Sequence, residues 1–245
     1  MEENYQIFGI RAVMEALRSG KTIDKVFIQK GLQGSLVQEL EDILQKEQTV
    51  RQYVPVEKLN RLTRKNHQGV VAQLSPVEYA DFEQLVVSAT ESGRTPLFLI
   101  LDHLSDVRNF GAIIRSAECT GVSGIIIPRK GSVSVTADAV KTSAGAAFRV
   151  PVCKVENLKD TILYLQGSGI KVLAATEKTD QLIYDTPMTE PLAIIMGAED
   201  TGIHPSLLKM ADDKAKLPMY GSTGSLNVSV ACALFLYEAM RQRTS

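Results

Sequence analysis

Three short segments hold polar residues whose types and spacing could support chemistry. They read N-x-G-x-x-x-R over residues 109–115, G-x-E-x-x-G over 197–202 and P-M-x-G-x-x-x-S-L-N-V-S over 218–229. Their guanidinium, carboxylate, amide and hydroxyl groups can bind an anion, accept a proton or orient a reacting hydroxyl. The candidate catalytic residues in these segments are Asn109, Arg115, Glu199, Ser225 and Asn227.

Short apolar runs, separated for the most part by helical patterns, must position these segments. Runs of this kind are typical of parallel strands that are buried on both faces of a sheet. The predicted strands are 97–101, 124–127, 148–152, 171–174, 192–196 and 214–217. Because an open α/β sheet builds its ligand crevice at the carboxyl ends of its strands, we expect the polar segments to meet at that edge.

The first part of the chain predicts a separate, smaller α/β module. Helical patterns in residues 5–20, 36–44 and 56–62 alternate with strand patterns at 25–28, near 53–55 and at 69–74. The alternation predicts a domain over residues 1–76. A polar stretch with a turn cluster at its end predicts a linker over 77–96, and the larger domain then spans 97–245.

The three polar segments, taken in order, resemble the signature motifs of the SpoU (TrmH-type) family of SPOUT RNA methyltransferases. The resemblance implies a C-terminal, mostly parallel α/β domain with a deep trefoil knot, formed by the segment from about residue 197 to residue 230. It also implies S-adenosylmethionine as the cofactor. The residues placed at the cofactor pocket by the resemblance are Met196, Gly197, Leu217, Met219 and Leu226.

Arg115 matches the arginine that the family uses to activate the ribose 2′-hydroxyl. A guanidinium is effectively always protonated, so we expect Arg115 to hold the adjoining phosphate or the developing alkoxide. The alternative from spacing alone is a surface arginine that pairs with a nearby acid such as Glu118. Asn109 is a candidate N-cap of the helix that carries Arg115, and Gly111 would permit a close approach of backbone or ribose.

The other candidate residues also have structural alternatives. Glu199 lies on a predicted tight loop, where it is either a solvated or capping side chain, a brace for the third motif or Asn227, or a general base. Ser225 and Asn227 precede the apolar helix predicted at 228–240, so either could be its N-cap. A capping side chain can also position substrate.

A run of basic residues in the first module carries the prediction for RNA. Its members, without an intervening acid, are Lys58, Arg61, Arg64 and Lys65. Such a run is commonly a solvated face. Because the module resembles the SpoU substrate-binding domain, we expect the run to contact phosphates, while the target base is recognised in an unpaired loop.

The resemblance implies 2′-O-methylation of a ribose in RNA by S-adenosylmethionine. Within the family it is greatest to the RlmB-type branch, which modifies a guanosine of 23S ribosomal RNA, and it implies a homodimer. One alternative is a transfer RNA 2′-O-methyltransferase of the same family. The other is a non-catalytic RNA-binding or ribosome-assembly protein that retains the fold.

The composition and charge of the chain exclude several classes of protein. The chain has 245 residues, 44% of them apolar, and a formal net charge of −1, so an RNA site must come from a local basic patch. Three scattered cysteines and three unlinked histidines predict buried reduced thiols and no metal site. A strand followed by G-x-G-x-x-G is absent, which argues against an ordinary Rossmann enzyme. The acidic start predicts neither a signal peptide nor a membrane anchor, and we expect a cytoplasmic protein.

Overall fold

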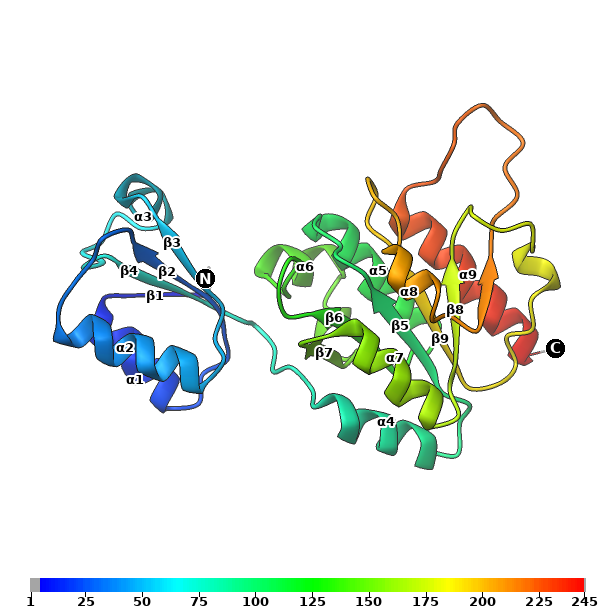
Figure 1. Cartoon of the computed structure of the whole chain (residues 1–245), viewed down its shortest axis with the longest axis horizontal. Helices are drawn as coiled ribbons and strands as arrows, with labels where there is room; N and C mark the ends of the chain where they lie inside the picture. The colour runs from blue at the N-terminus through cyan, green and yellow to red at the C-terminus, as the bar shows by residue number, and fades with distance from the viewer. Residues whose placement is uncertain (1–4, 245) are drawn as a thin grey trace. The chain divides into compact units, whose positions relative to one another are not determined.

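The computed structural model describes residues 5–244, which divide into two compact units at Glu78/Tyr79 (Figure 1). The residues Met1–Asn4, on which the expectation about a signal peptide or anchor rests, lie outside the described residues. Among the described residues, no helix combines the length and apolar character that a membrane crossing needs.

The first unit is a four-stranded sheet with helices on both faces. Its elements are β1 Gln6–Phe8, α1 Ile10–Arg18, β2 Ile23–Gln29, α2 Ser35–Lys46, β3 Arg51–Val54, α3 Val56–Leu62 and β4 Val70–Leu74. The sheet order is β1-β4-β2-β3, in which β4 is antiparallel to both neighbours and β2 is parallel to β3.

Alternation along β2 divides the core of the first unit into two. Val26 and Ile28 pack with residues of α1 and α2 on one face of the sheet. Phe27 points to the other face, where it packs with Leu59 of α3 and Val71 of β4. Successive strand residues point to opposite faces, so one strand serves both cores.

The second unit is built on a six-stranded parallel sheet of order β10-β8-β9-β5-β6-β7. Its elements are α4 Phe82–Glu91, β5 Leu97–Leu101, α5 Val107–Cys119, β6 Gly124–Pro128, α6 Ala137–Thr142, η1 Ala146–Phe148, β7 Val152–Val155, α7 Leu158–Gly167, β8 Lys171–Ala175, η2 Ile183–Asp185, β9 Leu192–Met196, α8 Pro205–Leu208, β10 Asp213–Ala215 and α9 Val228–Thr244. Strands β8, β9 and β5 are neighbours, so the loops that follow them emerge side by side.

Helices cover both faces of this sheet, as the continuous apolar strands predict. On one face, residues of α4, α7 and α8 share a core with Phe98, Ile100 and Ile195. On the other, α5 contacts α6 and α9, and α9 also contacts β9 (Figure 1). The predicted α/β class and parallel sheet are therefore confirmed.

Several predictions about elements and burial differ from the structure. The strand predicted at 148–152 is a short 3-10 helix followed by β7, because Gly145 takes a left-handed conformation and turns the chain. Half of the linker predicted at 77–96 is α4, whose Val86 and Ala89 are buried in the second unit's core. Cys119 is exposed, whereas the other two cysteines are buried as predicted.

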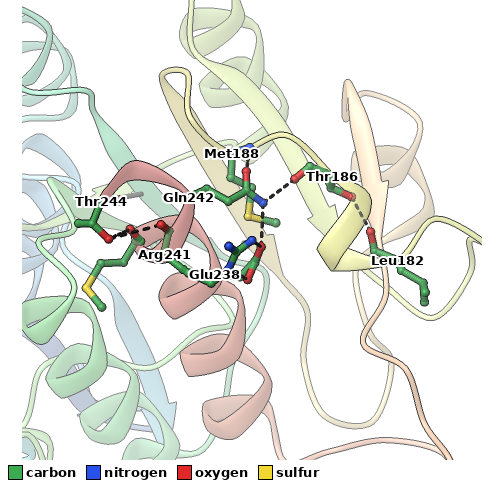
Figure 2. A network of polar contacts seen from close by, with 8 residues as sticks. Leu182, Thr186, Met188, Glu238, Arg241, Gln242 and Thr244 are labelled. Carbon is green, nitrogen blue, oxygen red and sulfur yellow. Dashed lines mark hydrogen bonds and ion pairs between the residues drawn. The ribbon is translucent and has the colours of Figure 1, made fainter.

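The last turns of α9 are tied to the segment that leads into β9 (Figure 2). Gln242 accepts from the backbone N–H of Met188 and donates to the carbonyl of Thr186 and to Glu238. Arg243 donates to four backbone carbonyls, those of Thr95, Pro96, Met188 and Glu190. These bonds fix the C-terminal end of the helix that follows the third motif.

Candidate active site

The structure brings three of the five candidate catalytic residues into direct contact. Asn109 and Asn227 each donate a side-chain N–H to the same oxygen, Oε1 of Glu199, at 2.8 Å. Asn227 also donates to Oδ1 of Asn109 at 3.1 Å. One residue from each motif therefore takes part in a closed polar triad, and the bond expected between Glu199 and Asn227 is present.

The helix caps explain how two of these side chains are aimed. Asp106 is the N-cap of α5 and accepts from the backbone N–H of Asn109 at 2.8 Å. The prediction that Asn109 caps this helix is therefore wrong: it lies in the first turn, and its carboxamide is available for Glu199. Asn227 caps α9, since its Oδ1 accepts from the backbone N–H of Ser229 and its carbonyl accepts from Ala231.

A tight loop after β9 presents Glu199. The backbone N–H of Gly202 donates to the carbonyl of Ala198 at 2.9 Å, and Gly202 has φ of 66°. A Cβ on Gly197 would lie 2.1 Å from the backbone of Gly202, so only glycine fits the first position of the loop. Pro205 then opens α8, where its missing N–H costs no helical hydrogen bond.

The buried carboxylate of Asp102 fixes the loops on either side of this segment. Its Oδ2 accepts from the backbone N–H of His204 at 2.7 Å, and its Oδ1 contacts Nδ1 of His103. Sequence spacing left the two histidines unlinked, but in the fold they share one acid. Asp102 follows β5 and His204 follows the β9 loop, so this contact joins the ends of two neighbouring strands.

A cavity of about 410 Å³ lies beside the triad, at the carboxyl ends of β8, β9 and β10. Every residue predicted to bind the cofactor lines it: Met196, Gly197, Leu217, Met219 and Leu226. Glu199 and Ser225 also line the cavity. Its size is typical of a site for a small organic molecule.

Four further lining residues of this cavity were not predicted from the sequence. Ala175, Thr176, Glu177 and Lys178, which end and follow β8, also line it. The signal was present, because a polar stretch follows the apolar run at 171–174 at the edge where parallel sheets bind ligands.

Arg115 does not line the cavity. It is exposed on α5, and among residues 5–244 it makes no hydrogen bond or ion pair. The acid proposed as its alternative partner is engaged elsewhere, since Glu118 binds Arg149 at 2.9 Å. The interpretation of Arg115 as a surface residue paired with Glu118 is therefore excluded.

Gly111 serves the packing of two helices. A Cβ at this position would lie 2.6 Å from Cβ of Thr142 and 2.9 Å from the carbonyl oxygen of Ala139. The glycine thus allows α6 to approach α5 closely, and the close approach expected here is made by the Thr142 side chain and the Ala139 carbonyl. It positions the small-residue segment 141–147 against the helix that carries Asn109 and Arg115.

In the first unit, the predicted basic residues gather on α3 and the loop after it. Lys58, Arg61, Arg64 and Lys65 are all exposed, and within the described part of the chain none of the four makes an ion pair. Lys58 lies over the ring of Phe27 and Lys65 over that of Phe8, each 5.3 Å from the ring centroid. Lys25 of β2 also lies over Phe27, at 5.9 Å, and the sequence analysis did not single it out.

Fold and site together define an α/β enzyme with a small-molecule cavity at the carboxyl edge of its sheet. Residues 96–237 match the SpoU rRNA Methylase family, and residues 6–80 match the domain described as RNA 2'-O ribose methyltransferase substrate binding. A Staphylococcus haemolyticus protein, named as a TrmH family tRNA/rRNA methyltransferase, is 41% identical over 98% of this chain and 97% of its own length.

Solved structures agree in fold. The SpoU methyltransferase AviRb from Streptomyces viridochromogenes is similar with a TM-score of 0.63 at 24% identity, over 98% of this chain and 90% of that one. An AdoMet-bound rRNA methyltransferase from Sinorhizobium meliloti is similar with a TM-score of 0.62 at 25% identity, over 97% of this chain and 87% of that one. The chain belongs to the SpoU (TrmH-type) family of SPOUT methyltransferases. It is an S-adenosylmethionine-dependent RNA methyltransferase.

The cavity fits this cofactor. Leu217, Met219 and Leu226 offer apolar surface to an adenine ring, and the carboxylates of Glu177 and Glu199 on the lining suit a cationic sulfonium compound. Among the described residues, no cluster of His, Cys, Asp and Glu could hold a metal ion.

Proposed function

We propose that this enzyme methylates the 2′-hydroxyl of a guanosine ribose in 23S ribosomal RNA. The observation that carries the proposal is the triad of Asn109, Glu199 and Asn227, which joins all three motifs at the edge of the cofactor cavity. The match of residues 6–80 to a 2′-O-ribose substrate-binding domain supports the ribose hydroxyl as the acceptor.

The residues divide the task between binding and activation. S-adenosylmethionine supplies an electrophilic methyl group on a sulfonium, and the lining residues Gly197, Leu217 and Leu226 hold it. Arg115, exposed and without a protein partner among residues 5–244, binds the phosphate beside the target ribose. Its fixed charge stabilises the alkoxide that develops as the hydroxyl loses its proton.

Glu199 acts as a positioning residue in this proposal. Two amide N–H groups already engage its Oε1, so that oxygen is committed to holding the motifs together. Ser225 lines the cavity two residues before Asn227. In this proposal its hydroxyl orients the ribose. The serine thus orients the substrate in this proposal, and the triad aligns the loops.

RNA recruitment falls to the first unit. The exposed cations Lys58, Arg61, Arg64 and Lys65 supply sequence-independent phosphate contacts. The target nucleotide is selected in an unpaired segment, whose ribose can enter the site.

We further propose a homodimer. Along α9 the apolar side chains of Val230, Leu234 and Tyr237 are 48%, 44% and 48% exposed, and they recur at helical spacing. A continuous exposed apolar stripe on a helix is typical of an interface. The trefoil knot is part of the same proposal, with the segment from residue 197 to residue 230 threaded.

Transfer RNA is the second candidate substrate, because the Staphylococcus haemolyticus relative is named for both tRNA and rRNA. The two candidates share the chemistry and differ in what the first unit recognises. A non-catalytic RNA-binding role is the third outcome that an experiment must separate.

Methyl transfer to each RNA tests the proposal. The enzyme is incubated with radiolabelled S-adenosylmethionine and unmodified 23S ribosomal RNA or unmodified transfer RNA, and the nucleosides are analysed. Label in 2′-O-methylguanosine from 23S RNA alone is expected. Label only from transfer RNA would keep the chemistry and replace the substrate, and absence of label with cofactor bound would favour the non-catalytic role.

A further inference from the structure

Ser229 contacts the triad from outside it. Its hydroxyl donates to Oδ1 of Asn227 at 2.6 Å, and its backbone N–H donates to the same oxygen at 3.0 Å. Ser229 is half-buried in the first turn of α9, and it does not line the cofactor cavity. It is therefore placed to act on Asn227 and not on the cofactor.

All four hydrogen-bonding positions of the Asn227 carboxamide are occupied. The oxygen accepts twice from Ser229, and the nitrogen donates once to Glu199 and once to Asn109. A carboxamide oxygen has two lone pairs and its nitrogen two hydrogens, so its capacity is filled.

The direction of these bonds determines which way the carboxamide faces. A flipped Asn227 would turn its oxygen toward the Glu199 carboxylate and the Asn109 oxygen, with acceptor facing acceptor at both contacts. Its nitrogen would then face the backbone N–H of Ser229. The backbone N–H of Ser229 thus selects the orientation in which Asn227 donates to both partners, and the Ser229 hydroxyl strengthens it with a second bond.

We propose that Ser229 is a positioning residue for methyl transfer, which sets the orientation of the Asn227 carboxamide and through it the alignment of the three motifs. This inference rests on the proposed function. The hydroxyl is the part that a substitution can remove, because the backbone N–H stays.

Ser229→Ala is expected to lower kcat about tenfold, the effect of losing one hydrogen bond of ordinary strength. The KM for RNA and the Kd for S-adenosylmethionine should stay within about twofold, since Ser229 does not line the cofactor cavity and acts in this proposal through Asn227. Ser229→Thr keeps the hydroxyl and should restore kcat to within about twofold of the wild type. Ser168→Ala is the matched control, because the Ser168 hydroxyl bonds only a carbonyl of its own helix.

A double-mutant cycle separates positioning from helix capping. In the Asn227→Ala background, Ser229→Ala should change kcat by less than about twofold, because its target is gone. A purely structural serine would lower Tm in both backgrounds and leave kcat of the folded enzyme unchanged. An unchanged kcat for Ser229→Ala, or an equal loss in both backgrounds, overturns the proposal.

Two further measurements cover the remaining outcomes. If Ser229→Ala fails to fold, Ser229→Cys replaces the hydroxyl with a weaker donor, and a loss of about threefold in kcat is expected. If the wild type methylates no RNA, the proposed function fails while the orientation of Asn227 stays measurable by NMR. Its side-chain amide should then exchange faster with solvent in Ser229→Ala, and an unchanged exchange rate would overturn the positioning role.

Discussion

The side-chain amide of Asn227 lies 2.8 Å from Oε1 of Glu199, and this bond joins the loop after β9 to the start of α9. The two residues are 28 positions apart, and several of the residues between them line the cofactor cavity. A change at this contact should therefore disturb the site without touching the core of the sheet.

Asn227→Asp replaces the donor with a second carboxyl group facing Glu199. Two carboxylates at this distance cannot both ionise at low cost, so the pair should bind a proton more readily than separate acids. At pH 8 the kcat of the variant should be about a tenth of the wild-type value. At pH 6 the two values should be closer. The matched control is Asn157→Asp, an asparagine cap of α7 with no acid partner shown, and its ratio should be independent of pH. Equal losses for Asn227→Asp at both pH values would contradict the contact's role.

The basic cluster of the first unit should govern the salt dependence of RNA binding. Replacing Lys58, Arg61, Arg64 and Lys65 by glutamine removes the four exposed cations on α3 and the loop after it. The slope of log K against log salt should fall by about 3, while the Kd for S-adenosylmethionine stays unchanged.

A second quadruple variant controls for net charge in that experiment. Arg11, Lys21, Lys30 and Lys46 are also exposed in the first unit but lie outside the cluster. Glutamine at these positions should leave most of the slope intact. Equal salt slopes for the two variants would mean that the cluster is a solvated face with no special role in binding RNA.

Thiol reactivity should distinguish the three cysteines. Cys119 is exposed, whereas burial raises the pKa of the Cys153 thiol to about 12 and also raises the pKa of Cys232. A thiol with a raised pKa forms little thiolate, which is the reactive species. At pH 8 a disulfide reagent should modify one thiol in the folded protein and three after unfolding. Folded Cys119→Ser should be unreactive, and rapid reaction of a second thiol in the folded wild type would contradict the burial.

Glu238 should contribute to stability in a way that depends on pH. Hydrogen bonds from Arg241, and then from Gln242, hold the pKa of this carboxyl below its ordinary value of 4.5, against the effect of its burial. A lowered pKa in the folded state means that the stabilisation is present above the unfolded-state pKa and is lost as pH falls through the folded-state value.

Glu238→Gln should accordingly lower the free energy of unfolding by about 1–2 kcal/mol at pH 7. The difference from wild type should shrink as the pH falls below about 4.5. Glu39→Gln is the control, because Glu39 forms an exposed pair with Arg18 and should change stability by less than about 0.5 kcal/mol. A difference that stays constant down to pH 3 would contradict the account.

The sequence predicted most of the sheet because its strands are short, apolar and bounded by turn residues. The runs at 97–101 and 192–196 coincide with β5 and β9, and both strands are fully buried. The run at 148–152 failed because apolar content alone does not distinguish a strand from a 3-10 turn. Phe148 is in fact 61% exposed, and the chain becomes extended only at Val152.

The motifs predicted the contact between Glu199 and Asn227, but they did not predict the contacts of Asn109. Asp106 and Asn109 are both good N-cap residues, and the local sequence could not decide which one takes the capping position of α5. The choice matters, since it leaves the Asn109 side chain available for a partner 90 positions away. Distances between residues so far apart depend on the topology of the sheet, which the local pattern does not contain.

The most direct test of the account follows the methyl group from S-adenosylmethionine to RNA in the wild type and in Arg115→Ala. The labelled RNA is hydrolysed with alkali, which cannot cleave beside a 2′-O-methylated ribose. We expect label in alkali-stable dinucleotides from the wild type. Arg115→Ala should lose at least about hundredfold in kcat at an unchanged cofactor Kd, and Arg94→Ala should retain activity. Label released as mononucleotides, or full turnover by Arg115→Ala, would contradict the account.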